Sequence, residues 1–128
     1  MANIIPVVIG GALGALLRYF VSTFAVKHFG TSFPYGTLIV NTIGSFLMVF
    51  FMILFFEKLN ASDSWRLFFA VGFLGALTTF SSFSYETIML FEKGNITKGI
   101  LNIILNNVFS ISAGVLGFIV ARYFIYKL

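Results

Sequence analysis

The sequence predicts an all-α membrane protein with four transmembrane helices. Of its 128 residues, 59% are hydrophobic and only 9% are charged, and the mean hydropathy is +1.04. A soluble domain of this size cannot bury so much apolar surface inside itself, so lipid must cover much of it. Four apolar stretches are long enough for a helix to cross a bilayer, which takes roughly 20 residues. The length allows one domain, residues 1–128.

The four predicted spans follow one another with short polar connections. They cover about residues 4–26, 35–56, 65–91 and 97–124. Polar residues mark the loops at 27–30, 57–64 and 92–95, and tyrosines near the end of the last span suit a membrane interface. Because the connections are short, neighbouring helices are expected to run antiparallel.

Composition excludes several kinds of chemistry. The chain has no cysteine, which rules out disulfides, thiolate nucleophiles and cysteine metal sites. Its single histidine, His28, stands beside Lys27 where the chain turns polar, and we interpret it as a loop residue. The four acidic residues form no evident acid–base pair, so an enzyme is not expected. Basic residues occur singly among apolar segments, so nucleic acid is not an expected partner.

The charges near the helix ends give almost no preferred orientation in the membrane. The face with both termini and the second loop carries four basic residues: Lys58, Arg66, Arg122 and Lys127. The opposite face carries three: Lys27, Lys93 and Lys98. By the positive-inside rule, either another cue orients the chain or copies insert both ways and pair antiparallel.

Two polar stripes run along predicted spans at helical spacing. Thr37, Asn41 and Ser45 recur every four residues in the second span. The fourth span repeats the pattern with Asn102, Asn106, Ser110 and Gly114. Each set projects from one helix face. The stripes are either contacts that join membrane helices or the lining of a polar pathway.

The first span carries Gly10, Gly14 and Arg18 at the same spacing. The glycines indicate a close-packing face. An arginine at the centre of a membrane helix costs about 2.5–3.5 kcal/mol on insertion scales. Arg18 is therefore expected either to reach the interface with its long side chain or to line a wet vestibule that attracts anions.

The third span contains the most informative segment. Gly72 and Gly75 precede five hydroxyl residues between positions 78 and 84. Glycine and hydroxyl residues weaken a helix, so a break is expected here in mid-membrane. A break frees backbone carbonyls, which must be buried in protein or satisfied by an ion. Phe80 and Phe83 share a face, and their ring edges either face an anion or simply pack.

Three motifs together resemble a known family. Residues 10–19 read GGALGALLRY, residues 36–45 read GTLIVNTIGS, and residues 72–86 read GFLGALTTFSSFSYE. The chain is similar, nearly end to end, to the bacterial fluoride exporters called Fluc channels or CrcB proteins. Ala76 and Ser82 depart from the residues that many relatives have, Gly and Thr, but keep their size and polarity.

The resemblance implies an antiparallel, dual-topology homodimer with two fluoride pores and a central structural sodium ion. The sodium would bind main-chain carbonyls of Gly75 and Thr78 from each subunit. Asn41 would donate to fluoride, and Phe80 and Phe83 would face it from different subunits. The remaining positions implied along the pore are Thr79, Ser110, Asn106, Thr37 and Ser81, with Arg18 near the vestibule and Glu86 as the carboxylate after the motif.

Fluoride suits a path of neutral donors, since it is small and strongly hydrated and its water must be replaced. The resemblance implies passive export across the bacterial inner membrane by a multi-pass protein. One alternative is a small dual-topology multidrug transporter, but that needs a carboxylate in the first helix, where this chain has Arg18. The other alternative is a structural subunit whose stripes bind partners.

Overall fold

Every regular element is helical in the part of the chain described by a computed structural model, residues 3–60 and 62–127. Helix α1 covers Ile4–Phe29, and α2 (Tyr35–Ile53) continues into the π-helical segment η1 (Leu54–Leu59). The third span consists of α3 (Asp63–Arg66), the π-helical η2 (Leu67–Leu74), α4 (Gly75–Leu77) and α5 (Phe80–Glu92), and the fourth is α6 (Ile96–Lys127).

Four helical stretches are long and apolar enough to cross a membrane: Ile4–Phe29, Tyr35–Glu57, Asp63–Glu92 and Ile96–Lys127. This confirms the prediction of four helices able to span a membrane. The first and last helices each run three residues beyond their predicted ends. Polarity alone does not stop a helix, and Lys27 and His28 lie in the last turn of α1, where cations suit the helix dipole.

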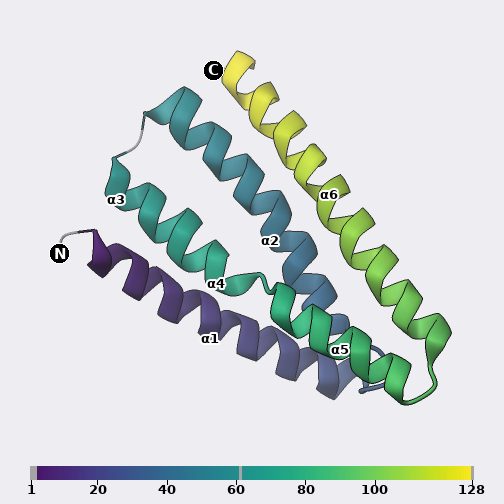
Figure 1. Ribbon diagram of the computed structural model, residues 1–128. Coiled ribbons are helices and arrows are strands. Elements are labelled where there is room, and N and C mark those ends of the chain that lie inside the picture. Colours follow the sequence, from purple (N-terminus) through teal and green to yellow (C-terminus); the bar gives the residue numbers. More distant parts are fainter. Residues whose placement is uncertain (1–2, 61, 128) are drawn as a thin grey trace.

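Consecutive spans run in opposite directions, as their short connections predict (Figure 1). The most extensive packing joins α2 to α6 and α1 to η2. The turn between α5 and α6 passes through Gly94, whose φ of 82° is a left-handed conformation that favours glycine. In the third span, η2 lies between α1 and α2, whereas α5 packs mainly against α6.

Glycines bring the backbones of α1 and η2 into direct contact. A Cβ atom on Gly10 or Gly14 would collide with the carbonyl oxygen of Phe68 or Phe73. A Cβ atom on Gly72 would lie 2.8 Å from the carbonyl oxygen of Val7. The prediction that the α1 glycines form a close-packing face is confirmed, and any larger side chain there would separate the two helices.

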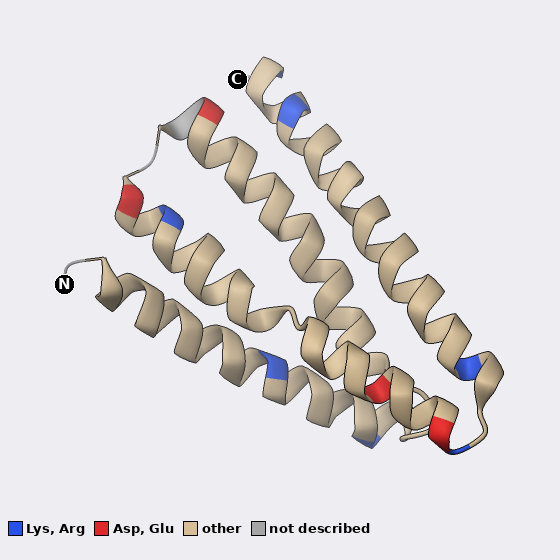
Figure 2. Cartoon of the chain, viewed as in Figure 1, with Lys and Arg blue, Asp and Glu red and all other residues tan. Residues whose placement is uncertain are grey.

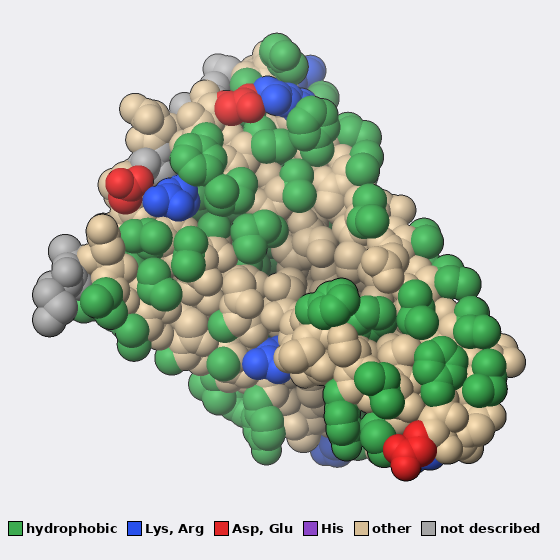
Figure 3. All heavy atoms as spheres, in the orientation of Figure 1, with side chains coloured by type: hydrophobic (Ala, Val, Ile, Leu, Met, Phe, Trp, Pro, Cys, Tyr) green, Lys and Arg blue, Asp and Glu red, His purple; other side chains and the backbone are tan. Residues whose placement is uncertain are grey.

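The interior of the protomer is small, and much of its apolar surface faces outward. Val40, Leu74 and Leu77 form the buried cluster between α2 and the third span. Green hydrophobic side chains cover much of the visible surface in Figure 3. Charged residues gather near the helix ends, with basic Arg18 partway along α1 and acidic Glu86 within α5 as exceptions (Figure 2). This distribution fits a chain surrounded by lipid.

Candidate functional site

Two extended residues, Thr78 and Thr79, separate α4 from α5 (Figure 1). Thr78 has φ −80° and ψ 152°, and Thr79 has φ −151° and ψ 118°. Thr79 caps the new helix, because its hydroxyl oxygen accepts a hydrogen bond of 3.1 Å from the backbone N–H of Ser82. The hydroxyl residues of this segment thus start α5 as an N-cap does elsewhere.

Asn41 binds the extended backbone of Thr79 at two points. The Thr79 N–H donates to Asn41 Oδ1 at 2.8 Å, and Asn41 Nδ2 donates to the Thr79 carbonyl at 3.1 Å. An unpaired buried backbone group costs about 1–3 kcal/mol, and Asn41 removes that cost at both groups. A single side chain from α2 therefore holds the junction between α4 and α5.

The carbonyls of Gly75 and Thr78 do not receive the N–H groups that would pair with them in a continuous helix. In a continuous helix, Gly75 O would accept from Thr79 N–H and Thr78 O from Ser82 N–H. Those two N–H groups donate to Asn41 and to the Thr79 hydroxyl instead. The neighbouring carbonyl of Ala76 accepts from Arg18 Nε at 3.0 Å.

The hydrogen bond of Arg18 places this half-buried side chain of α1 against the third span. Its guanidinium lies against the C-terminal end of α4, where carbonyls carry partial negative charge. The bond spans 58 positions in the sequence. Arg18 therefore stabilises the junction from the side of α1, while Asn41 does so from the side of α2.

A cavity of about 240 Å³ opens beside the junction, and we call it the Asn41 cavity. It contains six of the eight residues expected along the pore: Asn41, Thr79, Phe80, Phe83, Asn106 and Ser110. Ser45, Thr78, Asn107 and Ile111 complete the lining. None of these side chains is ionisable, so the cavity offers amides, hydroxyls and aromatic rings without a fixed charge.

The two phenylalanines form the aromatic side of this cavity. Their ring centroids lie 5.3 Å apart with an interplanar angle of 67°, an edge-on arrangement. Phe83 is 7% exposed, whereas Phe80 is 77% exposed. Only one of the two rings is therefore enclosed within the protomer.

The amide donors around the cavity form a connected series. Asn41 Nδ2 donates to Asn106 Oδ1 at 3.1 Å, and Asn106 Nδ2 donates to the side-chain and main-chain oxygens of Asn102 at 2.9 and 3.0 Å. Asn102 Nδ2 donates to Thr87 Oγ1 at 2.9 Å. The sequence predicted Asn102 as part of a polar stripe but not as a site residue. It did not identify Thr87, although this residue follows Phe83 at helical spacing.

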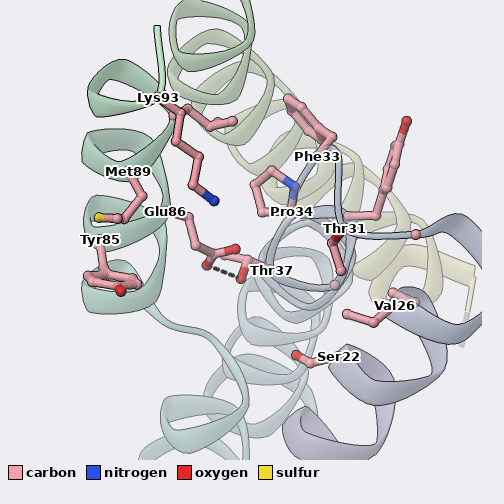
Figure 4. A pocket seen from close by; sticks show the side chains of 15 residues that line it. Ser22, Val26, Thr31, Phe33, Pro34, Thr37, Tyr85, Glu86, Met89 and Lys93 are labelled. Carbon is pink, nitrogen blue, oxygen red and sulfur yellow. Dashed lines mark hydrogen bonds between the residues drawn. The ribbon is translucent and has the colours of Figure 1, made fainter. Parts of the chain in front are cut away.

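Thr37 and Glu86 lie apart from the Asn41 cavity, in a second cavity of about 290 Å³ that we call the Glu86 cavity. The Thr37 hydroxyl donates to Glu86 Oε1 at 2.5 Å. Figure 4 shows this bond, with the Lys93 side chain pointing toward the same space. Thr37 stands one turn from Asn41 on α2, so the two cavities follow one another along that helix.

Ser81 lies in neither of these cavities. It is exposed and borders a shallow pocket with Ser82, Tyr85 and Glu86. Its hydroxyl is 3.3 Å from the hydroxyl of Thr79, which does line the Asn41 cavity. The predicted pore residues therefore fall into a main group around Asn41 and a smaller group around Glu86.

The sequence matches the family model described as CrcB-like protein, Camphor Resistance (CrcB), over residues 5–118. The chain belongs to the CrcB family. A relative named "Fluoride-specific ion channel FluC" from Sulfurihydrogenibium sp. (strain YO3AOP1) is 48% identical to this chain, and the match covers 95% of this chain and 98% of that one. The same name applies to a Legionella pneumophila (strain Paris) relative with 50% identity, covering 96% and 92%.

These matches confirm the resemblance to the CrcB family. A third relative of that name, from Clostridium perfringens (strain 13 / Type A), is 53% identical and covers 77% of each chain. The matched residues 5–118 contain both cavities and the Thr78–Thr79 junction. The family is one of ion channels and not of enzymes, as predicted. The four long apolar helices of this chain fit a multi-pass membrane protein.

Proposed function

We propose that this protein is a fluoride-selective channel that lets cytoplasmic fluoride leave the cell passively. The observation that carries the proposal is the Asn41 cavity, in which neutral donors and two aromatic rings surround one space. Its support is the close relatives named as fluoride-specific ion channels. The lining of the cavity and the names of the relatives both support fluoride as the ion.

The chemistry of the cavity suits a small, strongly hydrated anion. Amide N–H and hydroxyl groups replace the water that fluoride loses on entry. The ring edges of Phe80 and Phe83 present the positive part of the ring quadrupole. Because no fixed positive charge lines the cavity, the ion is not trapped, and conduction requires sites that release it.

The Glu86 cavity supplies a second stage of the same route in this proposal. It lies one turn away along α2, and its lining includes the Thr37 hydroxyl, the Glu86 carboxylate and Lys93, whose positive charge offsets that of the carboxylate. Arg18 contributes positive charge near the vestibule while it holds the Ala76 carbonyl. Ser81 lies beside this stage, next to Glu86.

An antiparallel pair of copies completes the site in this proposal. Phe80 is 77% exposed on the protomer although it belongs to the cavity lining. An apolar groove of about 580 Å³, lined by Gly44, Met48 and Gly114 among others, adjoins the Asn41 cavity and shares four lining residues with it. A second copy covers this ring and this groove, and two-fold pairing gives two equivalent pores.

Sodium at the centre of the pair fits the carbonyl groups at the junction. Gly75 O and Thr78 O have lost their helical donors to Asn41 and Thr79, and Gly75 is exposed on the protomer. Backbone carbonyl oxygens at a break in a membrane helix suit Na⁺. Sodium would bind these carbonyls from both copies and so link the two copies at their centre. It would take no part in moving the anion.

The bacterial inner membrane is the proposed location. In acid surroundings fluoride enters as neutral HF and becomes an anion inside, where the charge keeps it from crossing lipid. The membrane potential drives anions outward. An open passive pore therefore suffices for export.

The purified protein is expected to make liposomes permeable to fluoride and nearly impermeable to chloride. The test loads vesicles with either potassium salt, adds a potassium ionophore and follows efflux with an ion-selective electrode. Vesicles without protein give the background. Equal chloride and fluoride efflux would contradict selectivity, and background fluoride efflux would contradict the channel itself.

Dual topology predicts that one loop position faces both sides of the membrane. The chain has no cysteine, so Asn95→Cys in the α5–α6 turn provides a single label. We expect about half of the copies in intact cells to react with an impermeant maleimide, because the basic residues are nearly balanced. Labelling of all copies or of none would indicate a single orientation.

A further inference from the structure

A buried series of hydrogen bonds continues beyond the Asn41 cavity to two residues that do not line it. Asn102 is fully buried and Thr87 is 6% exposed. Asn106 Nδ2 donates to Asn102 Oδ1 at 2.9 Å, Asn102 Nδ2 donates to Thr87 Oγ1 at 2.9 Å, and Thr87 Oγ1 donates to the Phe83 carbonyl at 2.8 Å. The series joins α6 to α5 through polar atoms only.

The direction of this series is set at its far end. The Phe83 carbonyl can only accept, and the Thr87 hydroxyl donates its hydrogen to it. Thr87 Oγ1 then accepts from Asn102, which turns Asn102 Oδ1 toward Asn106. Asn106 consequently donates to Asn102 and turns its own Oδ1 toward Asn41, whose Nδ2 is the donor.

The near end of the series sets the same direction. The Thr79 N–H can only donate, and it holds Asn41 Oδ1 at 2.8 Å. Asn41 Nδ2 must therefore face the Thr79 carbonyl and Asn106. Backbone groups thus set the amide orientations at both ends and also in the middle, where the Asn102 carbonyl accepts from Asn106 Nδ2 at 3.0 Å. Hydrogen bonds in such a series polarise one another.

We propose that Thr87 and Asn102 are positioning residues that hold Asn106, and through it the Asn41 side chain, in place beside the anion path. The proposal rests on the proposed fluoride channel and adds to it the residues that hold its donor in place. Neither residue touches the ion. They act through Asn106, which is 5% exposed and stands between them and Asn41.

Loss of the Thr87 hydroxyl would remove the constraint at one end. Asn102 then has no acceptor for its N–H and is free to turn its amide around. A turned Asn102 presents N–H groups to the N–H groups of Asn106. Asn106 keeps the Asn102 carbonyl as an acceptor, but its side chain is displaced from Asn41. In part of the population Asn41 then loses Asn106 Oδ1 as a hydrogen-bond partner and is held less firmly beside the path, which weakens fluoride binding.

The experiment compares Thr87→Val, which has nearly the same shape, with Thr87→Ser, which keeps the hydroxyl. Fluoride efflux from liposomes is measured over a range of internal fluoride concentrations. We expect Thr87→Val to raise the half-saturating concentration by about threefold, within the range that one neutral hydrogen bond supplies. Thr87→Ser should restore the wild-type concentration, which a loss of packing would not do.

Thr42→Val is the matched control. Its hydroxyl is also buried, and it has no hydrogen-bond partner among the residues that the structure describes. We expect wild-type behaviour from this variant. An unchanged half-saturating concentration in Thr87→Val, or an equal rise in Thr87→Ser, would overturn the proposal.

Assembly and the proposed function are judged separately. If Thr87→Val does not assemble, Thr87→Ala takes its place, and failure of both to assemble would overturn the proposal by making Thr87 a packing residue. If wild-type liposomes carry no fluoride, the proposed function fails and this inference with it. If the wild type carries fluoride and only the Thr87 comparison fails, the inference alone is wrong.

Discussion

Fluoride flux through the Asn41→Leu variant is expected to fall by about 10- to 150-fold, because a hydrogen bond to a charged group contributes about 1.5–3 kcal/mol. Leucine has a similar size but no donor for the ion. It also leaves the N–H and carbonyl of Thr79 without the partner that holds them in the structure. Liposome efflux measures the loss of flux, and thermal unfolding in detergent measures the loss of stability.

Asn41→Asp separates these two effects. The carboxylate keeps an acceptor for the Thr79 N–H, so it retains one of the two bonds to the junction. It has no N–H to offer and adds a negative charge that repels an anion. We expect flux at least as low as in Asn41→Leu together with a smaller loss of thermal stability. Wild-type flux in Asn41→Asp would remove Asn41 from the path.

Helical spacing predicted which residues share a face but not what those faces meet. Asn41 and Asn106 were each placed in a stripe, and the structure brings the two stripes together at 3.1 Å. Thr37 belongs to the same stripe as Asn41 yet contacts Glu86 in a different cavity. One stripe can border two sites because a residue one turn further along meets a different part of α5.

Long-range contacts explain what the sequence could not predict. Arg18 was expected either at the interface or in a vestibule, and it binds the carbonyl of Ala76 on another span. No spacing rule connects these two positions. Thr87 follows Glu86 at a helix position that no stripe includes, and only the packing of α5 against α6 makes its hydroxyl a partner for Asn102.

Hydropathy was sufficient for the spans because lipid imposes a length and an apolar character on each of them. The junction at Thr78 and Thr79 needed more information. Weak helix formers indicated where a helix is easily interrupted, but Asn41 and Arg18 provide the partners that make the extended conformation stable. The local sequence thus indicates where the helix is interrupted, and the contacts with Asn41 and Arg18 stabilise the interruption.

Replacing either phenylalanine of the cavity with isoleucine is expected to lower fluoride flux by about 2- to 10-fold, since aromatic edge contacts contribute about 0.5–1.5 kcal/mol. Isoleucine stays apolar and fills much of the space but lacks a ring edge. Phe83 is enclosed within the protomer, so Phe83→Ile tests the ring where packing is already complete. Phe80 is exposed there, so Phe80→Ile tests the ring that a second copy would cover.

The two variants differ in what else they should change. A buried Phe83 contributes to packing, so Phe83→Ile should also lower the thermal stability of the protomer. Phe80→Ile should leave that stability nearly unchanged and act on flux, because the protomer does not enclose this ring. Phe24→Ile on α1, 57% exposed and outside the Asn41 cavity, controls for loss of an aromatic ring alone. Wild-type flux in both cavity variants would reduce Phe80 and Phe83 to packing residues, and the selectivity of the path would then rest on its amides and hydroxyls.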